Sequence, residues 1–93
     1  MKMATLYTVD GKITEVTPSK KKKFSLEELQ GFVDGYVEVL RLTDKKMLVV
    51  NEEGIFKGLP YNKPAMYHIA NEYGVKIPNL VGDVLVITKS EIR

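Results

Sequence analysis

The sequence contains no cysteine and only one histidine, His68, and these absences exclude whole classes of chemistry. Without cysteine there is no disulfide framework and no thiolate metal site, and a single histidine cannot form a histidine cluster. The hydrolase turn Gly-x-Ser-x-Gly, the P-loop, the dinucleotide loop and calcium-loop spacing are also missing. We therefore expect no cofactor, no metal and no catalytic residues.

Long apolar runs are absent as well. No run approaches the length of a membrane span, and residues 1–12 lack the apolar stretch that is typical of a signal peptide. The lack of cysteine suits a reducing compartment. We expect a cytoplasmic protein without membrane contact.

What the chain does have is the composition of a small folded domain. Its 93 residues are 44% hydrophobic, which predicts one α+β domain spanning 1–93 with a core of its own. A chain this short has little interior for a deep pocket. Any ligand site should therefore be a surface groove or lie between subunits.

The first half of the chain predicts a hairpin and a helix. Residues 5–9 and 12–17 alternate like strands, and Asp10-Gly11 between them predicts a type I′ turn, which needs positive φ at both residues. Ser25 and Glu28 have the spacing of a capping box at the start of a helix. Gly35 suits the left-handed position that ends it.

The second half predicts strands over 36–42 and 47–50, then a type I turn over 51–54 with positive φ at Gly54, and an optional strand at 55–56. A helix follows its N-cap Asn62 and ends at Gly74. Residues 84–87 are apolar at every position, which predicts a central strand. The order is β-β-α-β-β-(β)-α-β, and we expect a mixed or antiparallel sheet with both helices on one face.

Residues 51–65 hold the candidate ligand site. Most of this stretch has a structural interpretation, because it contains turn residues and a helix cap. A helix N-terminus nevertheless favours anions. Gly58 would let the backbone approach a ligand, Tyr61 offers a stacking face, Asn62 marks the helix start and Lys63 adds charge. We keep both interpretations and favour the structural one.

Three sets of charged residues could take part in binding or catalysis, and each has a simpler structural interpretation. The basic residues Lys20, Lys21, Lys22 and Lys23 form one local patch, and without them 10 basic residues face 12 acidic ones. They are candidates for phosphate contact, although a solvated loop is the favoured interpretation because no aromatic residues are interleaved. His68 and Glu72 are one helical turn apart, which predicts a solvated pair. Glu52 and Glu53 are adjacent and should diverge.

Four short segments follow one another in a distinctive order. They are Val37-Glu38-Val39, Asn51-Glu52-Glu53-Gly54, Leu59-Pro60-Tyr61-Asn62 with Ala65, and Val81-Gly82-Asp83-Val84. Over residues 29–88 the chain resembles an uncharacterised family of short proteins from phages, plasmids and other mobile elements. The first hairpin lies outside this resemblance. The resemblance implies an accessory protein of a mobile element in the bacterial cytoplasm.

These observations lead to ranked functional hypotheses. The first is a non-enzymatic protein-interaction module that uses a sheet edge or a helix face, with a protein partner that includes a second copy of itself as a homodimer. The alternative is a module for a small anionic ligand or nucleotide. Nucleic-acid binding ranks third and an enzyme last.

Overall fold

The computed structural model describes residues 4–18, 23–77, 79–88 and 90. Its strands form one antiparallel sheet in the order β2-β1-β5-β4-β3. The elements are β1 Ala4–Tyr7, β2 Ile13–Val16, α1 Leu26–Val33, β3 Val37–Arg41, β4 Lys46–Asn51, α2 Lys63–Tyr73 and β5 Val84–Thr88. The α+β class and the order of the elements are confirmed, and the antiparallel form of the sheet is the one observed.

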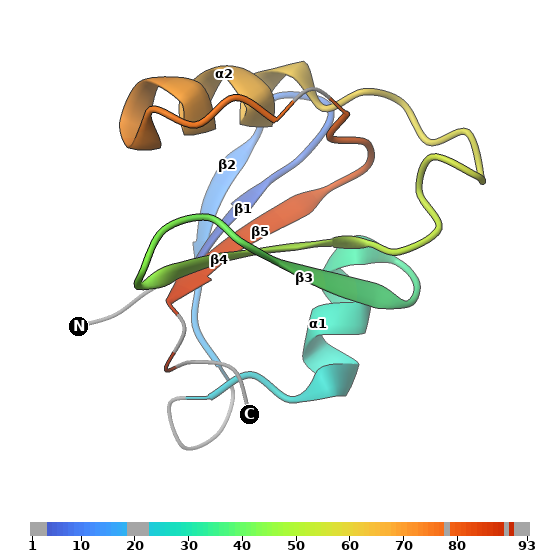
Figure 1. The fold of residues 1–93 in the computed structure, drawn as a ribbon. Coiled ribbons are helices and arrows are strands. Elements are labelled where there is room, and N and C mark those ends of the chain that lie inside the picture. Colours follow the sequence, from blue (N-terminus) through green and yellow to red (C-terminus); the bar gives the residue numbers. More distant parts are fainter. Residues whose placement is uncertain (1–3, 19–22, 78, 89, 91–93) are drawn as a thin grey trace.

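The helices lie on opposite faces of the sheet, with α2 above it and α1 below it (Figure 1). The expectation that both cover one face was wrong. Val84 and Val86 of β5 belong to the core beside α2, whereas Leu85 and Ile87 belong to the core beside α1. Because successive side chains of a strand point to opposite faces, a strand that is apolar throughout needs cover on both sides.

Helix α1 begins as its sequence predicts and ends one residue earlier than expected. Ser25 and Glu28 form the capping box. Phe24 is fully buried in the same core as Leu29. The left-handed residue at the helix end is Asp34, with φ of 58°, and not Gly35.

The first hairpin is confirmed, but its turn is not type I′. The Gly11 N–H donates to the Thr8 carbonyl, and the Thr8 N–H donates to the Lys12 carbonyl. Gly11 has φ of 95°, while Asp10 is not among the described residues with positive φ. The loop is therefore a three-residue one, in which a type I turn is followed by a left-handed glycine.

Residues 52–58 form successive turns, so the optional strand at 55–56 is absent. The expected positive φ at Gly54 is also absent. The role of Gly54 is steric, because a Cβ at this position would lie 2.7 Å from Cγ2 of Val81. Close packing between the loop and the segment before β5 therefore requires a glycine here.

Candidate interaction surface

Asn62 lies fully buried at the start of α2. Its Oδ1 accepts the N–H of Ala65 at 3.0 Å, which caps the helix. Its Nδ2 donates to the main-chain carbonyls of Tyr7 and Gly82, both at 2.9 Å. The acceptor and both donors of this amide are therefore in use, and the side chain has no exposed surface. Asn62 has a structural role. A ligand at this end of α2 would contact the residues next to Asn62.

Two of the four segments that carry the family resemblance, residues 59–62 and 81–84, meet at this same corner. The N–H of Gly82 donates to the carbonyl of Pro60 at 2.9 Å, and the N–H of Asn62 donates to the carbonyl of Leu80 at 2.8 Å. Oδ1 of Asp83 accepts the N–H of Val9 at 3.0 Å. The Leu-Pro-x-Asn and Gly-Asp segments thus hold each other and the first hairpin in place. Their hydrogen bonds are structural.

The N-terminus of α2 has few main-chain donors left for an anion. Pro64 has no N–H, the N–H of Ala65 bonds Asn62 Oδ1, and the N–H of Met66 bonds the Asn62 carbonyl. Within the described part of the chain, the N–H of Lys63 is the one amide of the first turn without a hydrogen-bond partner. The anion site remains a prediction, and its backbone contribution is one donor.

The other candidate residues around that end lie at the surface. Tyr61 is 58% exposed and forms an isolated bridge with Val81, and Lys63 is exposed. Gly58 has φ of 70° and open space where a side chain would be. Of the lysine block, Lys23 is exposed. Lys20, Lys21 and Lys22 lie outside the described residues.

A pocket of about 290 Å³ opens on the α2 side of the sheet, where β3, β4, residue 77 and residues 79–81 meet. Its floor is apolar and includes Leu40, Val50 and Leu80. Its charged lining residues are Glu38 and Glu52, and within the described ranges neither has an ion-pair partner. The pocket is therefore apolar inside and negatively charged at its rim.

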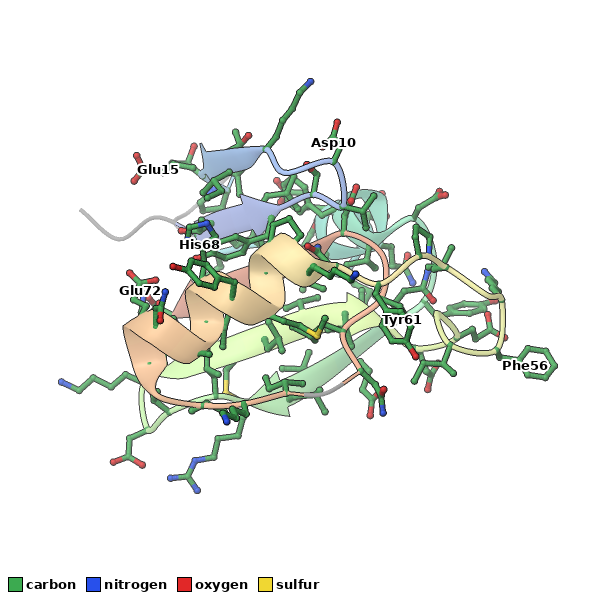
Figure 2. The ribbon with its side chains drawn as sticks, turned by 90° about the horizontal axis from the view of Figure 1, so that it is seen from above. Asp10, Glu15, Phe56, Tyr61, His68 and Glu72 are labelled. Carbon is green, nitrogen blue, oxygen red and sulfur yellow. The ribbon has the colours of Figure 1, made fainter. Side chains whose placement is uncertain are left out.

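The loop 52–58 presents a large apolar side chain to solvent beside this pocket. Phe56 is 91% exposed, and Figure 2 shows it at the tip of the loop, pointing away from the molecule. Ile55 is 67% exposed and also lines the pocket. Next to Phe56, Nζ of Lys57 lies 3.6 Å from Glu53. This loop, which we call the Phe56 loop, combines an exposed aromatic ring with the ion pair of Lys57 and Glu53 and with the carboxylate of Glu52.

Strand β3 is an edge strand, and its hydrogen bonds fix which backbone groups are free. The N–H of Leu42 donates to the carbonyl of Lys46, and the N–H of Glu52 donates to the carbonyl of Tyr36. Since bonded and non-bonded positions alternate in an antiparallel pair, the even-numbered residues of this strand bond β4. The backbone groups that point to the open edge belong to Val37, Val39 and Arg41.

His68 and Glu72 are not simply a solvated pair. The imidazole of His68 is half-buried and stacks on Tyr7, with 6.0 Å between the ring centroids. Burial, followed by the charge of Glu72, raises the pKa of Tyr7 to about 12. Both effects favour the neutral phenol. The contact between Tyr7 of β1 and His68 of α2 packs this helix against the sheet.

Over the described ranges, no group of three or more histidine or acidic side chains is arranged to hold a metal ion. No helix in that part of the chain combines the length and apolar character needed to cross a membrane.

Comparison with models of protein families identifies the family of this chain. A family model described as a domain of unknown function (DUF3846) matches residues 3–92. The chain belongs to the DUF3846 family. The match extends over the first hairpin, whereas the resemblance seen in the sequence covers residues 29–88. No curated protein and no solved structure matches the chain.

In this DUF3846 domain, sequence reasoning missed the pocket and the Phe56 loop. The signal for the loop was present, because Ile55-Phe56 is an apolar pair among turn and charged residues. We interpreted the pair as an optional strand, which would have hidden it. The pocket gave no local signal, since its lining comes from two strands and from a segment that follows about 25 residues later.

Proposed function

We propose that this domain is a non-enzymatic protein-interaction module that binds an extended segment of a partner protein along β3. The observation that carries the proposal is the open edge of that strand, where Val37, Val39 and Arg41 turn their backbone groups outward. An added strand pairs with such groups through main-chain hydrogen bonds, and neighbouring pockets supply specificity.

The β3 edge is better suited to this role than the other edge, β2, because the pocket lining includes residues of β3 and none of β2. Edge strands are commonly guarded against pairing by charged side chains. Two of the three outward residues of β3 are valines, Val37 and Val39. The pocket adjoins β3 through Glu38 and Leu40. A partner strand would carry, at alternate positions on that face, apolar or basic side chains that match the pocket.

The cellular setting is also part of the proposal. The order of the short sequence segments supports an accessory protein of a phage, plasmid or other mobile element, and the lack of cysteine supports the bacterial cytoplasm. Accessory proteins of this kind commonly act by binding.

The test uses a proline on the open edge. Peptides are selected on the wild-type domain from a random display library, and their affinities are measured for Val39→Pro and Glu15→Pro. Val39 turns its N–H outward, so proline there preserves the pairing with β4 but blocks an added strand. Glu15→Pro is the matched control, because Glu15 occupies a non-bonded position on the β2 edge.

We expect selected peptides to lose at least about tenfold in affinity for Val39→Pro and to bind Glu15→Pro like wild type. Equal binding to wild type and Val39→Pro would refute strand addition. Thermal unfolding of both variants checks that each is folded.

The second candidate function is binding of a small anionic ligand or nucleotide at the start of α2. The exposure of Tyr61 and Lys63 favours it. A thermal-shift screen against nucleotides tests it, with each hit measured again on Tyr61→Ala and on Lys63→Ala. Hits that survive both substitutions would contradict this site.

A further inference from the structure

Two carboxylates border the pocket next to the open edge of β3. Glu38 faces Val50 across the β3–β4 pair. The N–H of Glu52 donates to the carbonyl of Tyr36, which continues this pairing, so Glu52 is a diagonal neighbour of Glu38. Diagonal neighbours in an antiparallel pair lie roughly 7–8 Å apart. One cation placed between the two side chains would therefore interact with both charges.

The charge of these two carboxylates is not compensated within the described part of the chain. Nζ of Lys57 lies 3.6 Å from Glu53 and is thus engaged with another carboxylate. Arg41 is paired with Asp44. None of the described residues that line the pocket is basic. The local charge at this end of β3 is negative, and a positively charged group of a partner is complementary to it.

The floor between these carboxylates is apolar. Leu40, Val50 and Leu80 contribute to a pocket of about 290 Å³. A lysine or arginine side chain buries its aliphatic stem against apolar surface while its charged head stays close to water. An apolar cavity of about 150 Å³ holds benzene, so this pocket has room for such a stem. An acidic side chain would be repelled at the rim, and an aliphatic one would leave the carboxylates unpaired.

The open edge determines where on a partner strand this side chain lies. Val37, Val39 and Arg41 turn their backbone groups outward, so an added strand makes its hydrogen bonds at these positions. Glu38 and Leu40 then face the added strand at non-bonded pairs, where opposite side chains come closest. Since side chains alternate between faces, the partner residues at both positions point to the pocket side.

We propose that the pocket selects a partner segment with a lysine or arginine opposite Glu38 and an apolar residue opposite Leu40. The cation lies between Glu38 and Glu52, and the stem lies on the apolar floor. Because the strand pairs of this sheet are antiparallel, the added strand runs antiparallel to β3, and its sequence reads apolar, any residue, basic. This inference rests on the proposed strand addition and deepens it by stating the sequence that the partner carries.

The experiment compares the peptides that a random display library yields on wild type, on Glu38→Lys and on Glu15→Lys. The two variants change the net charge equally, and Glu15 is exposed on the β2 edge outside the pocket lining. Glu15→Lys is therefore the matched control for general attraction of basic peptides. We expect wild type and Glu15→Lys to select the apolar, any residue, basic pattern, and Glu38→Lys to lose the basic residue from it.

One selected peptide then measures the coupling between the two charges. Replacing its basic residue by glutamate should lower the affinity for wild type and for Glu15→Lys by at least about tenfold, because an attraction becomes a repulsion. The same replacement should cost much less on Glu38→Lys, whose new side chain attracts the glutamate. The affinity of the unmodified peptide for wild type should also fall as salt is added.

Two results would overturn this inference alone. One is a set of peptides that lose affinity for Val39→Pro but carry no basic residue two positions after an apolar one. The other is a glutamate replacement that costs as much on Glu38→Lys as on wild type. Peptides that bind Val39→Pro like wild type, or a library that yields no peptide, would overturn strand addition and this inference with it. Thermal unfolding of each variant checks that it is folded.

Discussion

The side-chain amide of Asn62 donates a 2.9 Å hydrogen bond to the main-chain carbonyl of Tyr7, 55 residues earlier in the chain. This bond ties the start of α2 to the end of β1. The same amide also bonds the carbonyl of Gly82. One buried residue thus joins three segments and caps a helix, which makes it a sensitive point of the fold.

Asn62→Ala should lower the free energy of unfolding by about 3 kcal/mol. The change removes a helix cap, worth about 1 kcal/mol, and leaves buried carbonyls without donors, which costs about 1–3 kcal/mol. Urea unfolding measures the loss. Asn62→Ser is the control, because serine restores the cap alone and should recover only about 1 kcal/mol. Full recovery by serine would contradict the role of the two carbonyl bonds.

Two glycines of the α1 region should respond to alanine in opposite directions. A Cβ at Gly35 would lie 2.7 Å from Nδ2 of Asn51, whereas a Cβ at Gly31, inside α1, meets nothing within 4 Å. Nδ2 of Asn51 donates to the carbonyls of Val33 and Asp34, so displacing it exposes the end of α1. We expect Gly35→Ala to lower stability by about 1–3 kcal/mol.

Gly31→Ala should raise stability by about 0.5–1 kcal/mol, because alanine restricts the unfolded chain and fits an open helix position. Denaturant midpoints of the two single variants give both values. A gain for Gly35→Ala, or a loss for Gly31→Ala, would show that packing around α1 differs from this account.

Stability should fall at high pH through Tyr7. Its pKa is raised from 10.0 to about 12, first by burial and then by Glu72. The folded protein therefore holds the phenol proton more tightly than the unfolded chain does. This contribution is fully present below pH 10 and is lost as pH rises through 12, and it amounts to roughly 2–3 kcal/mol.

Tyr7→Phe tests this dependence, because phenylalanine fills the same space without a titrating proton. Unfolding free energies measured on both proteins between pH 10 and pH 12 should fall more steeply for wild type. Tyr73, whose pKa is also raised by burial, remains in both proteins, and its charge is one of the smaller causes of the raised Tyr7 pKa. Parallel curves would show that the Tyr7 proton is not held as described.

The lysine block should have no role in folding. Adjacent like charges repel, so replacing Lys20, Lys21, Lys22 and Lys23 together with serine should leave the unfolding midpoint nearly unchanged. A large loss of stability would mean that the block is packed or paired. The same variant tests nucleic-acid contact. Salt-sensitive binding of a single-stranded oligonucleotide that this variant abolishes would support the third-ranked hypothesis.

Local signals in the sequence predicted most of the elements. The capping box of Ser25 and Glu28, the cap at Asn62 and the left-handed Gly74 are all present in the structure. These features depend on hydrogen bonds between near neighbours, so a short window of sequence contains them in full. The buried strand at 84–87 was predicted for the same kind of reason, from its unbroken apolar run.

The errors occur where a local signal allows two geometries. Asp10-Gly11 predicts a turn, but a type I turn with a following left-handed glycine closes the hairpin equally well, and the register of β1 with β2 selects it. Ile55-Phe56 has strand-forming residues but no partner strand, so the pair remains in a turn with Phe56 exposed. Sequence windows do not contain the partners that decide such cases.

The candidate site also combines features that the sequence predicted with features that it did not. The sequence by itself determined the helix cap at Asn62, the exposed approach at Tyr61 and the composition that excludes thiol and histidine-cluster chemistry. Only the tertiary structure decided that the Asn62 amide is committed to Tyr7 and Gly82, that the helices cover opposite faces, and that Glu38 and Glu52 border one pocket beside Phe56. The reason is physical, because caps and periodicity are set by bonds within a few residues, whereas a pocket or an edge exists only after distant segments have packed together.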